Sequence, residues 1–146
     1  MDADVTDKTP YIEAPALNKK VGAWLSTQKG KSVPFFLWVH YMDVHEPYVP
    51  ARKYVDLVDP SIRLTEDKMF ALFKSVLLKR DVSSRETVEL LRKLYMAGVR
   101  KADDATRELF RLLDEAGVLQ NSVVIITADH GDEFGEHGGL SHDGKM

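Results

Sequence analysis

Two short apolar runs constrain the fold of this chain more than any other feature. Residues 35–41 read FFLWVHY, and residues 122–127 read SVVIIT. Each run is about as long as one β-strand and is apolar at consecutive positions instead of alternate ones. Strands of this kind are buried on both faces, as in a parallel sheet that helices cover on each side. The sequence therefore predicts an α/β fold.

Three amphipathic helices are predicted around these runs. Apolar residues recur at helical spacing over residues 16–28, over residues 66–79 and, at greatest length, over residues 88–112. Residues 1–15 are interpreted as an irregular lead-in and residues 55–63 as an irregular connection. The order of helices and strands indicates a layered α/β/α domain around a mostly parallel or mixed sheet.

Composition excludes several classes of protein. The chain has 20 basic and 23 acidic side chains, a balance that argues against a nucleic-acid binder. No stretch is long and apolar enough to predict a membrane span, and the acidic first residues do not resemble a signal peptide. The chain contains no cysteine, which excludes disulfides, thiolate metal ligands and a cysteine nucleophile within it. The same absence favours a reducing compartment such as the cytoplasm.

A histidine-containing loop follows each apolar run. Residues 43–50 hold His45 and two prolines, and residues 128–139 read ADHGDEFGEHGG. In open α/β sheets, ligands bind beyond the carboxyl ends of the strands. Asp129 and His130 can offer an oxygen and a nitrogen ligand to one divalent ion. An acidic, glycine-rich surface loop whose histidine bonds only to the backbone explains the same residues equally well.

Taken together, the two loops resemble segments of the sulfatase family, within the alkaline phosphatase superfamily. The stretch VVIITADHGDEFGEHG is similar to the second metal-binding segment of that family, and FFLWVHYMDVHEPY is similar to its strand-plus-histidine segment. The long helix ending in LLDEAG lies between them, in the order that the family has. The resemblance implies that residues 1–146 form part of a sulfatase-like catalytic domain, with the nucleophile segment and the C-terminal subdomain outside it.

The resemblance also implies a role for each matching residue. Asp129 and His130 correspond to ligands of one divalent metal ion, with calcium the first choice and magnesium or manganese the others. His45 corresponds to the histidine that contacts the ester group and can protonate the leaving oxygen. Lys145 lies near the position of the family lysine that contacts the sulfate oxygens, and His142 is a further candidate for substrate binding.

The family nucleophile is not encoded within these 146 residues. The chain has no cysteine and no Ser-x-Pro-x-Arg motif, so the formylglycine of the family is expected upstream. We therefore expect part of a sulfuric ester hydrolase that cleaves a small-molecule or carbohydrate sulfate ester and is inactive alone. A phosphonate monoester hydrolase, a phosphodiesterase or a phosphoethanolamine transferase of the same superfamily is the alternative chemistry. A non-catalytic domain that binds a metal or a partner is the alternative class.

Two further expectations concern packing. Unpaired sheet edges would favour self-association of this chain. One histidine of the first apolar run and three helical residues are predicted to lie in the core, namely His40, Trp24, Tyr95 and Met96. His137 is assigned a structural role or a role in supporting the site residues without contacting the substrate.

Overall fold

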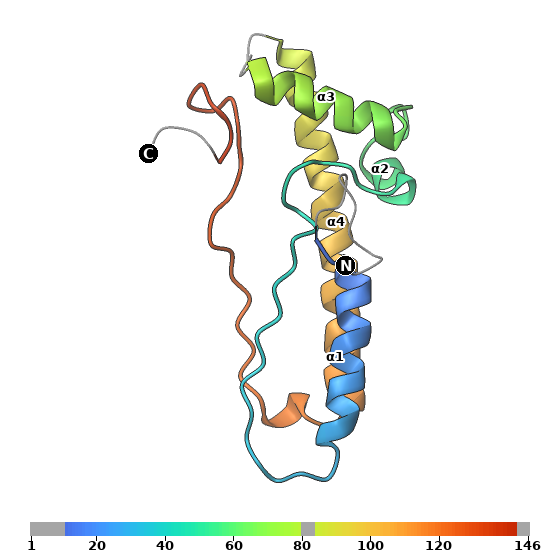
Figure 1. Ribbon diagram of the computed structural model, residues 1–146, viewed down its shortest axis with the longest axis vertical. Helices are drawn as coiled ribbons and strands as arrows, with labels where there is room; N and C mark the ends of the chain where they lie inside the picture. Colours follow the sequence, from blue (N-terminus) through green and yellow to red (C-terminus); the bar gives the residue numbers. More distant parts are fainter. Residues whose placement is uncertain (1–10, 80–83, 143–146) are drawn as a thin grey trace. The chain divides into compact units, whose positions relative to one another are not determined.

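The structure of this chain, a computed structural model, describes residues 11–79 and 84–142 (Figure 1). Its internal contacts divide it into two compact units. Lys145 lies outside the described residues. The long helix α4, Arg85–Glu115, contributes to both units. Among the described residues, unit 1 comprises residues 11–43 and 102–125, and unit 2 comprises residues 44–79, 84–101 and 126–142.

Unit 1 is built on the contact between α1 (Ala14–Gln28) and the second half of α4. The side-chain amide of Asn18, which is 2% exposed, donates to the carbonyl of Ala105 at 2.8 Å. The hydroxyl of Tyr41 donates to the other end of the same amide at 2.5 Å, so both polar ends of the buried side chain are satisfied. Helix α1 begins two residues earlier than predicted because Pro15 fits its first turn, where a missing N–H costs no hydrogen bond.

The two apolar runs are extended but do not pair as strands, which differs from the prediction. Residues 31–42 and 122–128 form no strand, although a short 3₁₀ helix, η1 (Leu119–Asn121), precedes the second run. Several of their apolar side chains face solvent, among them Phe36 at 86% and Ile125 at 81% exposure. A strand needs a neighbouring strand to exchange backbone hydrogen bonds with, and the described residues bring none to these segments. The predicted α/β/α sheet is therefore not assembled within residues 11–79 and 84–142.

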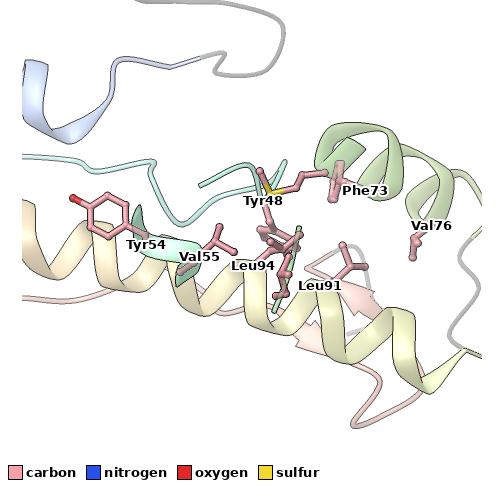
Figure 2. Packing of buried hydrophobic residues seen from close by; sticks show 10 residues of the cluster. Tyr48, Tyr54, Val55, Phe73, Val76, Leu91 and Leu94 are labelled. Carbon is pink, nitrogen blue, oxygen red and sulfur yellow. The ribbon is translucent and has the colours of Figure 1, made fainter. Parts of the chain in front are cut away.

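Unit 2 holds the main hydrophobic cluster. In this cluster, side chains of α2 (Arg52–Val58) and α3 (Glu66–Lys79) pack against the first half of α4. Leu91 and Leu94 of α4 belong to the same cluster as Tyr48 and Phe73, and Figure 2 labels these side chains. The extents of α3 and α4 confirm two of the predicted helices. Helix α2 was not predicted, since residues 55–63 were interpreted as irregular.

A small hairpin closes unit 2. Strand β1 (Glu133–Phe134) pairs antiparallel with β2 (Leu140–Ser141), in the register Glu133 opposite Ser141 and Phe134 opposite Leu140. Phe134 and Leu140 pack against the hydrophobic cluster, which anchors one face of the hairpin. Within the described residues, this pair is the sheet of the chain.

Four individual burial predictions have mixed outcomes. His40 is exposed and Met96 is 41% exposed, so the prediction that they are core residues is wrong. Trp24 and Tyr95 are half-buried, and each packs its ring against another aromatic residue, Phe35 for Trp24 at 4.9 Å between ring centroids. The exposure of His40 follows from the unpaired extended run on which it lies.

Candidate functional site

Three histidines from separate parts of the sequence meet in unit 2. His45 lies in the loop before α2, His130 precedes β1, and His142 follows β2. The ring centroids of His130 and His142 are 4.4 Å apart, and those of His45 and His142 are 5.1 Å apart. His45 and His130 are separated by 6.5 Å between centroids. The structure thus brings together His45 and His130 of the two loops that the sequence singled out, with His142 between them.

The register of the hairpin places Asp132 opposite His142. Because Glu133 pairs with Ser141, the next residues outward on each strand are Asp132 and His142. Their side chains meet, with 3.0 Å between Oδ1 of Asp132 and Nδ1 of His142. Asp132 was not predicted as a site residue. The signal that could have found it is the spacing of the turn glycines, which centres a hairpin between these two positions.

The tip of the hairpin is held by Glu133. Its carboxylate accepts the backbone N–H of Gly139 at 3.0 Å and also the backbone N–H of His137. Gly135 and Gly138 have φ of +90° and +86°, values that glycine adopts at little steric cost. A Cβ at Gly139 would lie 2.6 Å from Oε2 of Glu133, so any other residue at this position requires the carboxylate to move. These contacts fix the turn that joins the two sides of the site.

Asp132 is tied to the hydrophobic cluster by Tyr48. The Asp132 side chain is 6% exposed, and its Oδ2 accepts the hydroxyl of Tyr48 at 2.7 Å. The Tyr48 ring is itself buried against the rings of Phe73, Tyr95 and Phe134. Burial, followed by the hydrogen bond to Asp132, raises the pKa of the Tyr48 phenol. The phenol therefore stays protonated and acts as the donor that orients the carboxylate.

The Asp129–His130 pair is more exposed than Asp132. Nδ1 of His130 lies 3.0 Å from the carbonyl oxygen of Gly131, which can only accept, so Nδ1 carries the proton in this contact. The other ring nitrogen, Nε2, lies 3.9 Å from Oδ2 of Asp129. The backbone bond predicted by the surface-loop alternative is thus present, but it uses only one of the two ring nitrogens. The Asp129 side chain is 76% exposed.

His45 is held by its own loop in a similar way. Its Nδ1 lies 2.8 Å from the carbonyl oxygen of Glu46, so Nδ1 is the donor and Nε2 is the nitrogen that can exchange a proton. The carboxylate of Glu46 in turn accepts the hydroxyl of Ser141 at 2.5 Å, which joins this loop to β2. Ser141 adopts a φ of +63°, an uncommon conformation for a residue other than glycine. The His45 loop and the hairpin are therefore linked by side-chain hydrogen bonds.

One group of side chains has the composition of a metal site. His130, Asp132 and His142 each offer one ligand atom, and these atoms lie within 4.8 Å of one another. The group shares His130 with the predicted pair, contains Asp132 in place of Asp129, and includes His142, which was predicted to bind substrate. His137 stands apart from this group, with its side chain 88% exposed. Within residues 11–79 and 84–142, no helix combines the length and apolar character that crossing a membrane requires.

The chain matches the model of one protein family and is similar in sequence to two known proteins. The model of the Sulfatase family matches residues 5–146. The choline-sulfatase of Rhizobium meliloti (strain 1021) is 28% identical over 150 residues, covering 93% of this chain and 29% of the relative. The multifunctional alkaline phosphatase superfamily protein PehA of Trinickia caryophylli is 24% identical over 149 residues, covering 87% of this chain and 29% of that relative. The chain therefore spans less than a third of the length of these two proteins. No solved structure matches it.

Proposed function

This chain belongs to the sulfatase family, and from that membership we propose that it supplies part of the active centre of a metal-dependent sulfuric ester hydrolase. The family has an α/β fold of the alkaline phosphatase type. The two units described above, which are mostly helical and contain one two-stranded sheet, correspond to an incomplete part of that fold. The observation that carries the proposal is the meeting of the His45 loop with the His130 loop inside unit 2.

The Asp129–His130 pair fits a metal ion. Ligand atoms bound to one ion lie about 3–4 Å apart when each bond is about 2.0–2.4 Å long. The 3.9 Å between Oδ2 of Asp129 and Nε2 of His130 falls in this range. We assign these two side chains as ligands of one divalent cation, with calcium the first choice and magnesium or manganese the others. Such an ion, when bound, supplies positive charge to the oxygens of the ester.

His45 is assigned the proton transfer to the leaving oxygen. Its Nδ1 bond to the Glu46 carbonyl fixes the ring and leaves Nε2 to exchange the proton. An imidazole suits this task because its ordinary pKa lies near neutrality. Lys145, with its fixed positive charge, is assigned to the anionic oxygens of the substrate, and His142 to contact with the substrate. The nucleophile is assigned to a segment upstream of this chain.

The substrate class is proposed as a sulfate monoester of a small molecule or carbohydrate. The name of the choline-sulfatase relative supports this choice. A phosphonate monoester or a phosphodiester is the second candidate, and the name of the multifunctional alkaline phosphatase superfamily relative supports it.

The test uses the product of the complete open reading frame that contains this chain. Hydrolysis of 4-nitrophenyl sulfate, choline sulfate, bis(4-nitrophenyl) phosphate and 4-nitrophenyl phenylphosphonate is measured, before and after removal of metal with a chelator. We expect the sulfate esters to be preferred and the chelator to abolish turnover.

Two variants and one control assign the residues. His45→Asn should lower kcat by about 10²–10⁴-fold on esters with a poor leaving group and by less on 4-nitrophenyl sulfate, whose leaving group needs less protonation. Asp129→Asn should raise the metal concentration required for activity. His137→Asn, at an exposed histidine of the same loop, should behave as the unchanged protein. A preference for the phosphorus esters would replace the sulfate assignment, and absence of all four activities with metal bound would favour a binding domain.

A further inference from the structure

We infer that His130, Asp132 and His142 form a binding site for a divalent transition-metal ion of the zinc class, whose ligand set overlaps the Asp129–His130 pair only at His130. Two imidazoles and one carboxylate suit zinc, nickel, copper and iron, whereas calcium takes oxygen ligands almost throughout. Three protein ligands also leave a coordination position open, as in sites where zinc meets a further molecule.

Two of the three ligand atoms already have the spacing of neighbours around one ion. Oδ1 of Asp132 and Nδ1 of His142 are 3.0 Å apart. Two ligands with bonds of about 2.1 Å that meet at a right angle are separated by about 3 Å. An ion that takes the place of the proton shared by these atoms would therefore contact both without moving either strand.

His130 completes the set by rotating its side chain. All three ligand atoms lie within 4.8 Å, about 1 Å more than one coordination sphere allows. The His130 side chain is 42% exposed, so solvent leaves room for its ring to approach. Nδ1 of this ring donates to the backbone carbonyl of Gly131, so Nε2 is the nitrogen that would bind the metal. A histidine ligand held through its other nitrogen is the usual arrangement in metal sites.

The Asp132 carboxylate is held in place by a hydrogen bond on the oxygen that faces away from His142. Tyr48 donates to Oδ2 of Asp132, which directs Oδ1 toward His142. The hairpin register places the two ligands opposite one another before any ion arrives. The site is therefore largely formed by the fold, and this lowers the entropic cost of binding.

The shared histidine has a consequence for the enzyme, and this step rests on the proposed function. Nε2 of His130 can serve one ion at a time, so an ion held by Asp132 and His142 withdraws His130 from the Asp129 pair. Zinc-class ions are then competitors of the catalytic cation, acting through a ligand set that includes His142 and excludes Asp129.

The test measures binding by the purified chain, with Co²⁺ followed by its visible absorption, Zn²⁺ by calorimetry and Ca²⁺ in separate titrations. His142→Ala should weaken Co²⁺ and Zn²⁺ binding by at least about tenfold, since even loss of an outer partner of a ligand costs about 10–100-fold. His130→Ala, at an exposed position, should do the same, so the conclusion does not depend on the hairpin tolerating His142→Ala. Far-UV circular dichroism verifies that the helices remain in each variant.

Two controls separate this inference from the proposed function. His137→Ala removes an exposed histidine of the same hairpin and should leave all three affinities unchanged. Asp129→Asn should weaken Ca²⁺ alone. If His142→Ala binds Co²⁺ as tightly as the unchanged chain, or if His137→Ala loses as much, the transition-metal site is wrong. If Asp129→Asn leaves Ca²⁺ binding unchanged, the cation assignment of the proposed function is wrong while the zinc-class site stands.

Discussion

Replacing Tyr48 by phenylalanine should destabilise unit 2 through the loss of one hydrogen bond. The substitution keeps the ring that packs against Phe73, Tyr95 and Phe134 and removes only the hydroxyl. That hydroxyl donates to Asp132 at 2.7 Å, and the Asp132 side chain is 6% exposed. The carboxylate would therefore lose a donor that water cannot easily replace.

The expected magnitude follows from the kind of bond. A hydrogen bond to a charged group contributes about 1.5–3 kcal/mol, and burial of both partners places this one within that range. Urea unfolding followed by circular dichroism at 222 nm measures the change in free energy. With an m value of about 2 kcal/mol/M, typical of small proteins, the midpoint should fall by about 1 M urea.

Tyr54 provides the matched control. Its ring is 5% exposed and belongs to the same cluster, but Figure 2 shows its hydroxyl directed away from the labelled side chains. Tyr54→Phe should therefore change the free energy of unfolding by less than about 0.5 kcal/mol, as at sites without a buried partner. Equal effects of Tyr48→Phe and Tyr54→Phe would refute the role of the bond. So would additive effects of Tyr48→Phe and Asp132→Ala in a double-mutant cycle, because partners in contact should show a coupling energy.

Two further predictions concern acid stability and association. The hydrogen bond from Lys93, followed by those from Ser61, holds the pKa of Asp59 well below its usual range. The carboxylate therefore stabilises the fold above about pH 4, and this contribution is lost as the pH falls. Asp59→Asn should lower the melting temperature at pH 7 and make the melting temperature less sensitive to acid. A variant whose melting temperature depends on pH as in the unchanged chain would contradict this prediction. Trp38 and Ile125 are 70% and 81% exposed on unpaired extended segments, so the chain should self-associate in sedimentation velocity. Trp38→Ser with Ile125→Ser should shift it toward monomer, and a chain that is monomeric without these substitutions would show that the segments do not pair.

The helices could be predicted from the sequence because their signal is local. Apolar residues three and four positions apart identify the stripe of α4 that carries Leu91 and Leu94, whatever packs against it. Helix α2 lacks this signal, since it has seven residues and buries only Tyr54 and Val55. The prediction of two strands was wrong because strand pairing is not a local property. An apolar run indicates that a segment is suited to burial on both faces, but its pairing depends on another segment that lies elsewhere in the chain.

In the candidate site, too, the residues with a local sequence signal were predicted and those that depend on distant contacts were not. His45 and His130 stood out because each follows an apolar run, and the structure brings both loops into unit 2. Asp132 could not be found in this way, because its importance depends on a register that pairs it with His142 and on a hydroxyl from Tyr48, 84 residues away. The assignment of Lys145 falls outside the described residues and stays a prediction.

The packing of Gly139 against Glu133 has an evolutionary consequence. A side chain at position 139 would collide with the carboxylate that caps the tip of the hairpin, and a shorter residue at position 133 would remove both the collision and the cap. The two positions should therefore co-vary, with glycine favoured where glutamate keeps these contacts and a larger residue favoured where glutamate is lost. Among descendants of this sequence, replacement of Glu133 should precede replacement of Gly139, so the order of the two substitutions becomes a record of this contact.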